Sequence, residues 1–176
     1  PPGRLNATFR LVISKSDGNV VEANVISFND LQGVSVTAGS GNTIRGNSIF
    51  ENKGLGIDLS ADGVTLNDAG DADTGPNELV NFPTITSAVV GSATVSGSLA
   101  GTPNTTLLIE VFSNTTCDPS GFGEGQSLIG STTKMTDAAG SANFAVPPST
   151  PIVLGTIFTA TATDPAGNTS EFSPCL

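Results

Sequence analysis

Apolar and polar residues alternate in short runs through the first third of the chain, and these runs recur after 23 residues. Two apolar positions repeat through three successive units: Leu11, Val34 and Ile57, and Ile13, Val36 and Leu59. Short alternating runs bounded by Gly and Asn are typical of β-strands. A repeat of this length indicates a solenoid, in which each unit buries its apolar residues against the next.

Two kinds of solenoid have such a period, leucine-rich repeats and parallel β-helices. A leucine-rich repeat needs a helical or nearly helical return segment, and these units show no apolar residues at helical spacing. The β-helix is therefore favoured. Inward side chains of adjacent coils then stack about 4.8 Å apart, and we expect two further ladders: Val21 with Ile44, and Ile26 with Ile49.

Asn and Gly recur with the same period as the apolar residues. The pairs are Gly18 and Gly41, Asn19 and Asn42, Asn24 and Asn47, Asn29 and Asn52, and Gly33 and Gly56. We expect these residues at the corners between strands. Asn tolerates left-handed backbone angles there, and its side-chain amide can bond to the adjacent coil.

The repeat Asn-x-Ile-x-x-Asn-x-x-x-Gly-Ile/Val-x-Leu/Val resembles the right-handed parallel β-helix repeats of many secreted and surface proteins. The resemblance covers residues 10–62. It implies the fold but leaves the activity open, because this family includes polysaccharide lyases, hydrolases, adhesins and plain spacers.

The 23-residue pattern stops at Pro83, and seven short alternating segments follow: ITSAVV, ATVSGSL, TLLIEVF, SLIGSTTK, ANFAV, TIFTATATD and TSEFS. Seven strands with turn-rich links such as DAAG and DPAG are typical of a β-sandwich of immunoglobulin size. The ending ATATDPAGNTSEFS resembles the last hairpin of the bacterial Ig-like modules that follow such β-helices, over residues 84–176. We predict two domains: residues 1–82, the β-helix with an acidic junction, and residues 83–176, the Ig-like sandwich.

Composition narrows the classes of partner. The formal net charge is −10, and the chain has no His, Trp or Tyr. This charge repels nucleic acid and anionic lipid, and no segment is long and apolar enough for membrane insertion. The chain begins Pro1-Pro2-Gly3, without an initiator Met or a leader, so we expect a processed piece of a longer protein.

The junction between the two parts is rich in carboxylates. Asp68, Asp71 and Asp73, with Asn67, Asn77 or Glu78, are candidate oxygen ligands for Ca²⁺ around a Gly-rich turn. The spacing is not that of an EF-hand, because no Glu stands at the twelfth position after Asp71. The alternative is a solvated acidic loop without metal.

Cys117 and Cys175 are the only cysteines. An even pair in a chain that resembles secreted proteins predicts one disulfide, since neither the spacing of a redox pair nor a His for a metal site is present. Sequons occur at Asn6, Asn104, Asn114 and Asn168, which weakly favour an extracellular or cell-surface location.

The best catalytic constellation is Asp58 and Asp62 with Lys53 or Arg45 as a cation, since paired carboxylates serve glycosidases. Strand alternation turns Asp58 outward, where we expect an ordinary exposed residue, so we expect no enzyme. The favoured function is a non-catalytic structural or adhesive module of a surface or matrix protein. Its expected partners are copies of itself, neighbouring domains of a longer chain, or surface polysaccharide.

Two alternative functions stay open. One is a filament subunit that pairs through the open first coil and the extended segment from Leu5 to Ile13. The other is a fragment of a β-helix polysaccharide lyase or hydrolase.

Overall fold

The computed structural model describes residues 10–91 and 94–176, and their regular secondary structure consists almost entirely of β-strands. No helix of the described residues is long and apolar enough to cross a membrane. Asn6, with its sequon, and residues 5–9 of the segment proposed for filament pairing lie outside the described residues.

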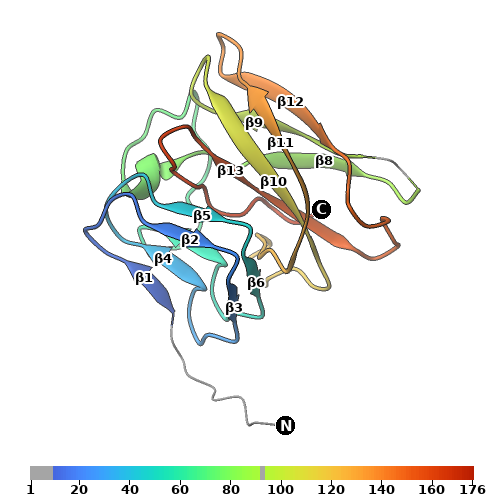
Figure 1. Ribbon diagram of the computed structural model, residues 1–176, viewed down its shortest axis with the longest axis horizontal. Coiled ribbons are helices and arrows are strands. Elements are labelled where there is room, and N and C mark those ends of the chain that lie inside the picture. Colours follow the sequence, from blue (N-terminus) through green and yellow to red (C-terminus); the bar gives the residue numbers. More distant parts are fainter. Residues whose placement is uncertain (1–9, 92–93) are drawn as a thin grey trace.

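Residues 11–59 form a solenoid of seven three-residue strands (Figure 1). They are β1 (Leu11–Ile13), β2 (Val20–Glu22), β3 (Val25–Ser27), β4 (Val34–Val36), β5 (Thr43–Arg45), β6 (Ser48–Phe50) and β7 (Ile57–Leu59). They pair in parallel as β1-β4-β7, β2-β5 and β3-β6. We call residues 11–33 the first coil and residues 34–56 the second coil.

The register of these ladders confirms the predicted stacking. Leu11 pairs with Val34 and Val34 with Ile57, and the pairs of Val21 with Ile44 and of Ile26 with Ile49 are also present. The inward residues of the second coil are buried, whereas Leu11 on the first coil is exposed, since no strand of the described part of the chain covers it.

The corners differ from the prediction that Asn itself takes the left-handed conformation. No corner Asn has a positive φ. The residue before each corner Asn has one: Gly18, Ala23, Phe28, Gly41, Gly46 and Glu51. The Asn side chain is then free to bond to the adjacent coil, and that part of the prediction is confirmed. Asn52 Oδ1, for example, accepts bonds from the backbone N and Nδ2 of Asn29 at 3.1 and 2.6 Å.

Residues 60–83 connect the solenoid to the second part and contain the short 3-10 element η1 (Pro76–Leu79). Two three-stranded antiparallel sheets follow, in the orders β12-β9-β8 and β11-β10-β13 (Figure 1). Their strands are β8 (Thr84–Ala88), β9 (Val95–Ala100), β10 (Thr106–Asn114), β11 (Ser127–Met135), β12 (Ser141–Val146) and β13 (Ile157–Thr163). The two sheets enclose an apolar core that includes Val95, Ile109, Val146 and Ala160.

The seventh predicted segment, TSEFS, runs beside β13 without forming a regular strand. Two serine hydroxyls take part in place of a continuous backbone ladder: Ser170 Oγ accepts from the backbone N of Ala162 and Ser173 Oγ from that of Ala160. The predicted disulfide between Cys117 and Cys175 is present and ties this terminal segment to the loop after β10.

Candidate functional site

The end of the solenoid that follows the second coil is covered by the sandwich. Phe112 on β10 and Phe172 in the terminal segment belong to the same apolar cluster as the inward side chains of the coils. Their rings meet edge to face, with centroids 5.4 Å apart. The loop before β11 pairs with β6 through two backbone bonds between Ile49 and Gly125, each 2.8 Å long. The later part of the chain thus contributes two aromatic side chains to the core of the solenoid.

Side-chain oxygens of the later residues take the place that the Asn residues of a further coil would occupy. Glu124 accepts bonds from both the backbone N and Nδ2 of Asn52, as Asn52 accepts both from Asn29. Asn77 Oδ1 accepts from the backbone N of Asn42 at 3.0 Å. Four more side-chain oxygens accept from backbone N–H groups at this end: Asn168 from Gly41, Thr169 from Ile44, Glu110 from Gly46 and Glu171 from Leu59. We call this set of acceptors the end cap.

The end cap contains three carboxylates: Glu110 and Glu171 are buried and Glu124 is half-buried, and burial raises the pKa of each. The pKa of Glu171 rises to about 7, mainly through burial, although bonds from the backbone N of Thr65 and Leu59 favour the charged form. Burial likewise raises the pKa of Glu110 and of Glu124. Sequence reasoning missed these three residues. For Glu110 the available signal was a charged residue inside the apolar run TLLIEVF, whereas the polar neighbours of Glu124 and Glu171 gave no such signal.

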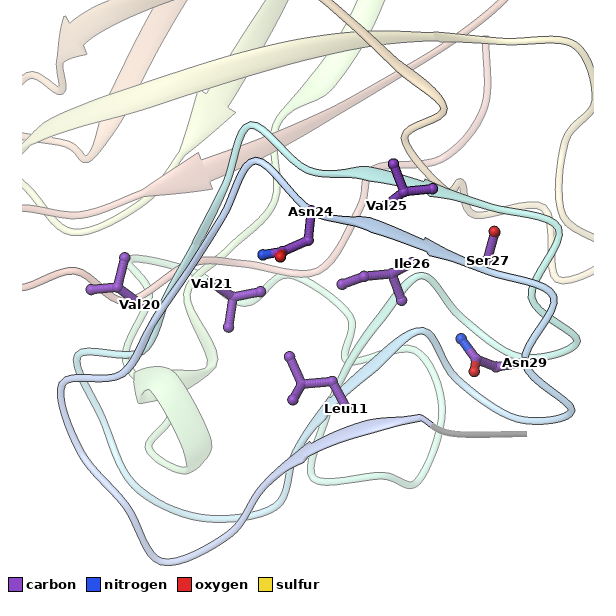
Figure 2. A pocket seen from close by; sticks show the side chains of 8 residues that line it. All are labelled: Leu11, Val20, Val21, Asn24, Val25, Ile26, Ser27 and Asn29. Atoms are coloured by element: carbon purple, nitrogen blue, oxygen red, sulfur yellow. The ribbon is translucent and has the colours of Figure 1, made fainter. Parts of the chain in front are cut away.

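Among residues 10–91 and 94–176, no strand covers the opposite end of the solenoid. A groove of about 530 Å³ lies against the first coil and is lined by Leu11, Val20, Val21, Asn24, Val25, Ile26, Ser27 and Asn29. Figure 2 shows Leu11, Val21 and Ile26 turned toward the inside of the coil, while Val20 and Val25 point away from it. The groove is therefore lined by inward apolar side chains of the first coil and by apolar side chains on its rim.

The predicted metal ligands are brought together in part. One carboxylate oxygen from each of Asp68, Asp71 and Asp73 lies within 4.8 Å of the others. Burial raises the pKa of Asp73, and the charges of Asp68 and Asp71 raise it further. Asp73 Oδ1 is buried without a hydrogen-bond partner among the described residues. The cluster thus gathers negative charge around an unsatisfied acceptor.

The amide residues suggested for this metal are used elsewhere. Asn77 is buried in the end cap, where its Nδ2 donates to the backbone O of Asn42 and of Thr169. Asn67 bonds to both backbone groups of Phe82. Glu78 is exposed and does not belong to the carboxylate group. The candidate ligand set is therefore reduced to the three aspartates.

The predicted catalytic residues also come together in part. Asp58, Asp62 and Lys53 line a shallow pocket of about 410 Å³, while Arg45 is elsewhere and pairs with Glu22. Lys53 pairs with Asp30 at 2.6 Å.

Asp58 departs from the expected exposure. It points away from the coil interior but is buried, and its Oδ2 accepts a bond from Gln32 Nε2 at 2.8 Å. Burial raises its pKa.

Comparison with protein families supports the solenoid. Residues 5–70 match the family model described as a right-handed beta helix region, which agrees with the parallel ladders of β1 to β7. A comparison with curated proteins finds no match to this chain. The family description assigns no chemistry. The candidate functional features are therefore the two ends of the solenoid, the pockets and the aspartate cluster.

Proposed function

We propose that the protein is a non-catalytic structural module of an extracellular or cell-surface protein. In this proposal three right-handed coils abut an Ig-like sandwich and act with it as a single stiff unit that carries load or adhesion. The disulfide is compatible with an extracellular location, because such bridges persist in oxidising surroundings.

The end cap is the observation that carries this proposal. A hinged pair of domains meets at a small, polar and exchangeable interface. Here Phe112 and Phe172 complete the core of the solenoid, and Gly125 lies so close that a Cβ atom on it would stand 2.6 Å from the Phe172 ring and 2.8 Å from that of Phe112. Side-chain acceptors also satisfy the backbone donors of the second coil. These contacts favour transmission of force and disfavour bending.

A mechanical test follows. We expect the oxidised full chain, stretched from its two termini, to show one unfolding event in which solenoid and sandwich rupture together, because the end cap belongs to both. Single-molecule force spectroscopy measures this. Two events separated in force, one for each part, would contradict the proposal.

The polysaccharide-cleaving alternative rests on Asp58 in its pocket beside Asp62. A buried carboxylate with a raised pKa can serve as a general acid. Both oxygens of Asp58 already accept hydrogen bonds, from Gln32 and more weakly from the backbone N of Gly63, which suits a structural role. Release of reducing ends or unsaturated products from polyuronates, lost in Asp58→Asn, would favour the enzyme over the module.

We also propose that Ca²⁺ binds between Asp68, Asp71 and Asp73, supported by the convergence of their oxygens and by the unsatisfied Oδ1 of Asp73. Calcium at 100 times its dissociation constant is expected to stabilise the protein by about 2.7 kcal/mol. Thermal unfolding with added Ca²⁺ and with a chelator measures this difference. Asp73→Asn should remove it, whereas Glu78→Gln should retain it. Equal melting temperatures in both buffers would leave a plain acidic loop.

A further inference from the structure

Three of the four Asn-x-Ser/Thr sequons lie among the described residues, at Asn104, Asn114 and Asn168. Such a triplet is an acceptor for N-linked glycosylation in secreted proteins when it stands at the surface. The sequence does not rank the three, because each has the required Ser or Thr two positions later. The structure separates them by the burial and by the hydrogen bonds of the Asn side chain.

Two of these Asn side chains are used by the fold. Asn114 and Asn168 are 7% and 3% exposed. Asn114 Nδ2 donates to Thr159 Oγ1 at 3.0 Å, and its Oδ1 accepts from the backbone N of Gln126 at 2.7 Å. Asn168 Nδ2 donates to Asp164 Oδ2 at 2.8 Å, and its Oδ1 belongs to the end cap. A glycan on either Nδ2 would need space that packed protein already fills, so neither residue can carry one in the folded chain.

The third sequon has the opposite properties. Asn104 is exposed in the turn between β9 and β10, and Thr106, the last residue of its sequon, is exposed at the first position of β10. Within residues 10–91 and 94–176 neither of these two side chains takes part in a hydrogen bond. The amide that would be modified and the hydroxyl that would be recognised are therefore both accessible.

The turn is held in place without the side chain of Asn104. The backbone N of Asn104 donates to the backbone O of Asp137 at 3.1 Å, and that of Thr105 donates to Thr136 Oγ1 at 3.0 Å. Asn104 has a φ of 54°, which Asn and Gly adopt more readily than other residues. The turn lies at the opposite end of β10 from the loop that pairs with β6 (Figure 1). A bulky substituent on this turn therefore leaves the end cap intact.

From this contrast we propose that Asn104 is an N-glycosylation site, modified as the chain passes through a secretory pathway. The donor is a sugar carried on a lipid diphosphate. Asn104 Nδ2 forms a bond to the anomeric carbon of the sugar, and the bond from that carbon to the diphosphate oxygen breaks with its electron pair leaving on the diphosphate. One proton of Nδ2 passes to a base of the transferase. The proposal rests on the proposed extracellular location and adds a large hydrophilic group at one end of the sandwich.

The test uses the full chain, secreted from a eukaryotic cell behind an added leader and recovered from the medium in its folded, oxidised form. Enzymatic release of N-glycans in heavy-oxygen water converts each modified Asn into a labelled Asp, which peptide mass spectrometry locates. We expect label at Asn104 and none at Asn114 or Asn168. Asn104→Gly, which suits the positive φ, should abolish the label, as should Thr106→Ala, which removes the recognised hydroxyl. Thr105→Ala, at the unrecognised middle position, is the matched control and should keep it.

Three results would overturn the proposal: a folded, secreted chain without label at Asn104, label at Asn114 or Asn168 in the folded protein, or label at Asn104 that survives Thr106→Ala. The number of unfolding events under force is measured on the deglycosylated chain and is independent of this site. A chain that is unmodified at Asn104 but unfolds in one event would overturn the glycosylation site alone. A chain that is modified at Asn104 but unfolds in two events would overturn the mechanical proposal alone.

Discussion

Phe172→Ala is expected to lower the free energy of unfolding by about 3–5 kcal/mol, the usual cost of truncating a buried aromatic side chain. Phe172 is 3% exposed, packs edge to face against Phe112, and stands so close to Gly56 and Gly125 that neither could carry a Cβ atom without a clash. The cavity would open at the junction of the solenoid and the sandwich. Both parts should therefore lose stability together.

Denaturant unfolding measures the free energy, and hydrogen exchange locates the loss. Exchange should accelerate at the amides of β5, β6 and β7 as well as at β13. Leu154→Ala is the matched control, because Leu154 is 92% exposed and its truncation should leave stability nearly unchanged. Faster exchange confined to β13 would show that the solenoid does not depend on the end cap.

Stability is expected to fall as the pH rises through about 7. The pKa of Glu171 is raised from its ordinary 4.5 to about 7, so the folded protein binds this proton more tightly than the unfolded chain does. The stabilising contribution is then fully present below about pH 4.5 and is lost as the pH rises through 7. A difference of this size corresponds to about 3 kcal/mol. The raised pKa values of Glu110 and Glu124 act in the same direction.

Urea unfolding at pH 5 and pH 8 checks this expectation. Glu171→Gln should flatten the profile, since it removes the titrating group, and should lower stability at both pH values because one of the two acceptors for Leu59 and Thr65 is replaced by an amide NH₂. Glu78→Gln, at an exposed position, serves as the control. A wild-type protein more stable at pH 8 than at pH 5 would contradict the assignment.

The solenoid was predictable because its information is local and repeated. A 23-residue period places Val34 over Leu11 and Ile57 over Val34, and the parallel ladders keep that register. The Asn ladders were predictable for the same reason. The left-handed corner residue was misassigned, because Gly18 and Gly41 mark it plainly but Ala23, Phe28 and Glu51 do not. Sequence reveals a left-handed corner position only when that position is occupied by glycine, which adopts positive φ without a steric cost.

The end cap was not predictable, because its contacts join residues with no shared period. Gly41 bonds to Asn168 across 127 positions, and Leu59 bonds to Glu171 across 112. Asp58 shows the same limit. Strand alternation correctly predicted that the side chain of Asp58 points away from the coil interior. Its burial, however, depends on residues distant in sequence, such as Gln32 and the loop that carries Asp118. The acidic cluster could be recognised in the sequence. That Asn77, a suggested ligand of this cluster, instead bonds to Asn42 in the end cap could not.

The large sequence separation between the coils and the end cap has a consequence for folding during synthesis. The coils are synthesised first, while Phe172 and Glu171 leave the ribosome more than a hundred residues after Leu59 (residue separation 112 for Glu171). Until then the last coil exposes its donors and core, which is costly and invites mispairing. The end of the solenoid can therefore be covered only after the C-terminal segment has been synthesised. A truncated chain that lacks this segment would expose apolar side chains and unpaired backbone donors at that end.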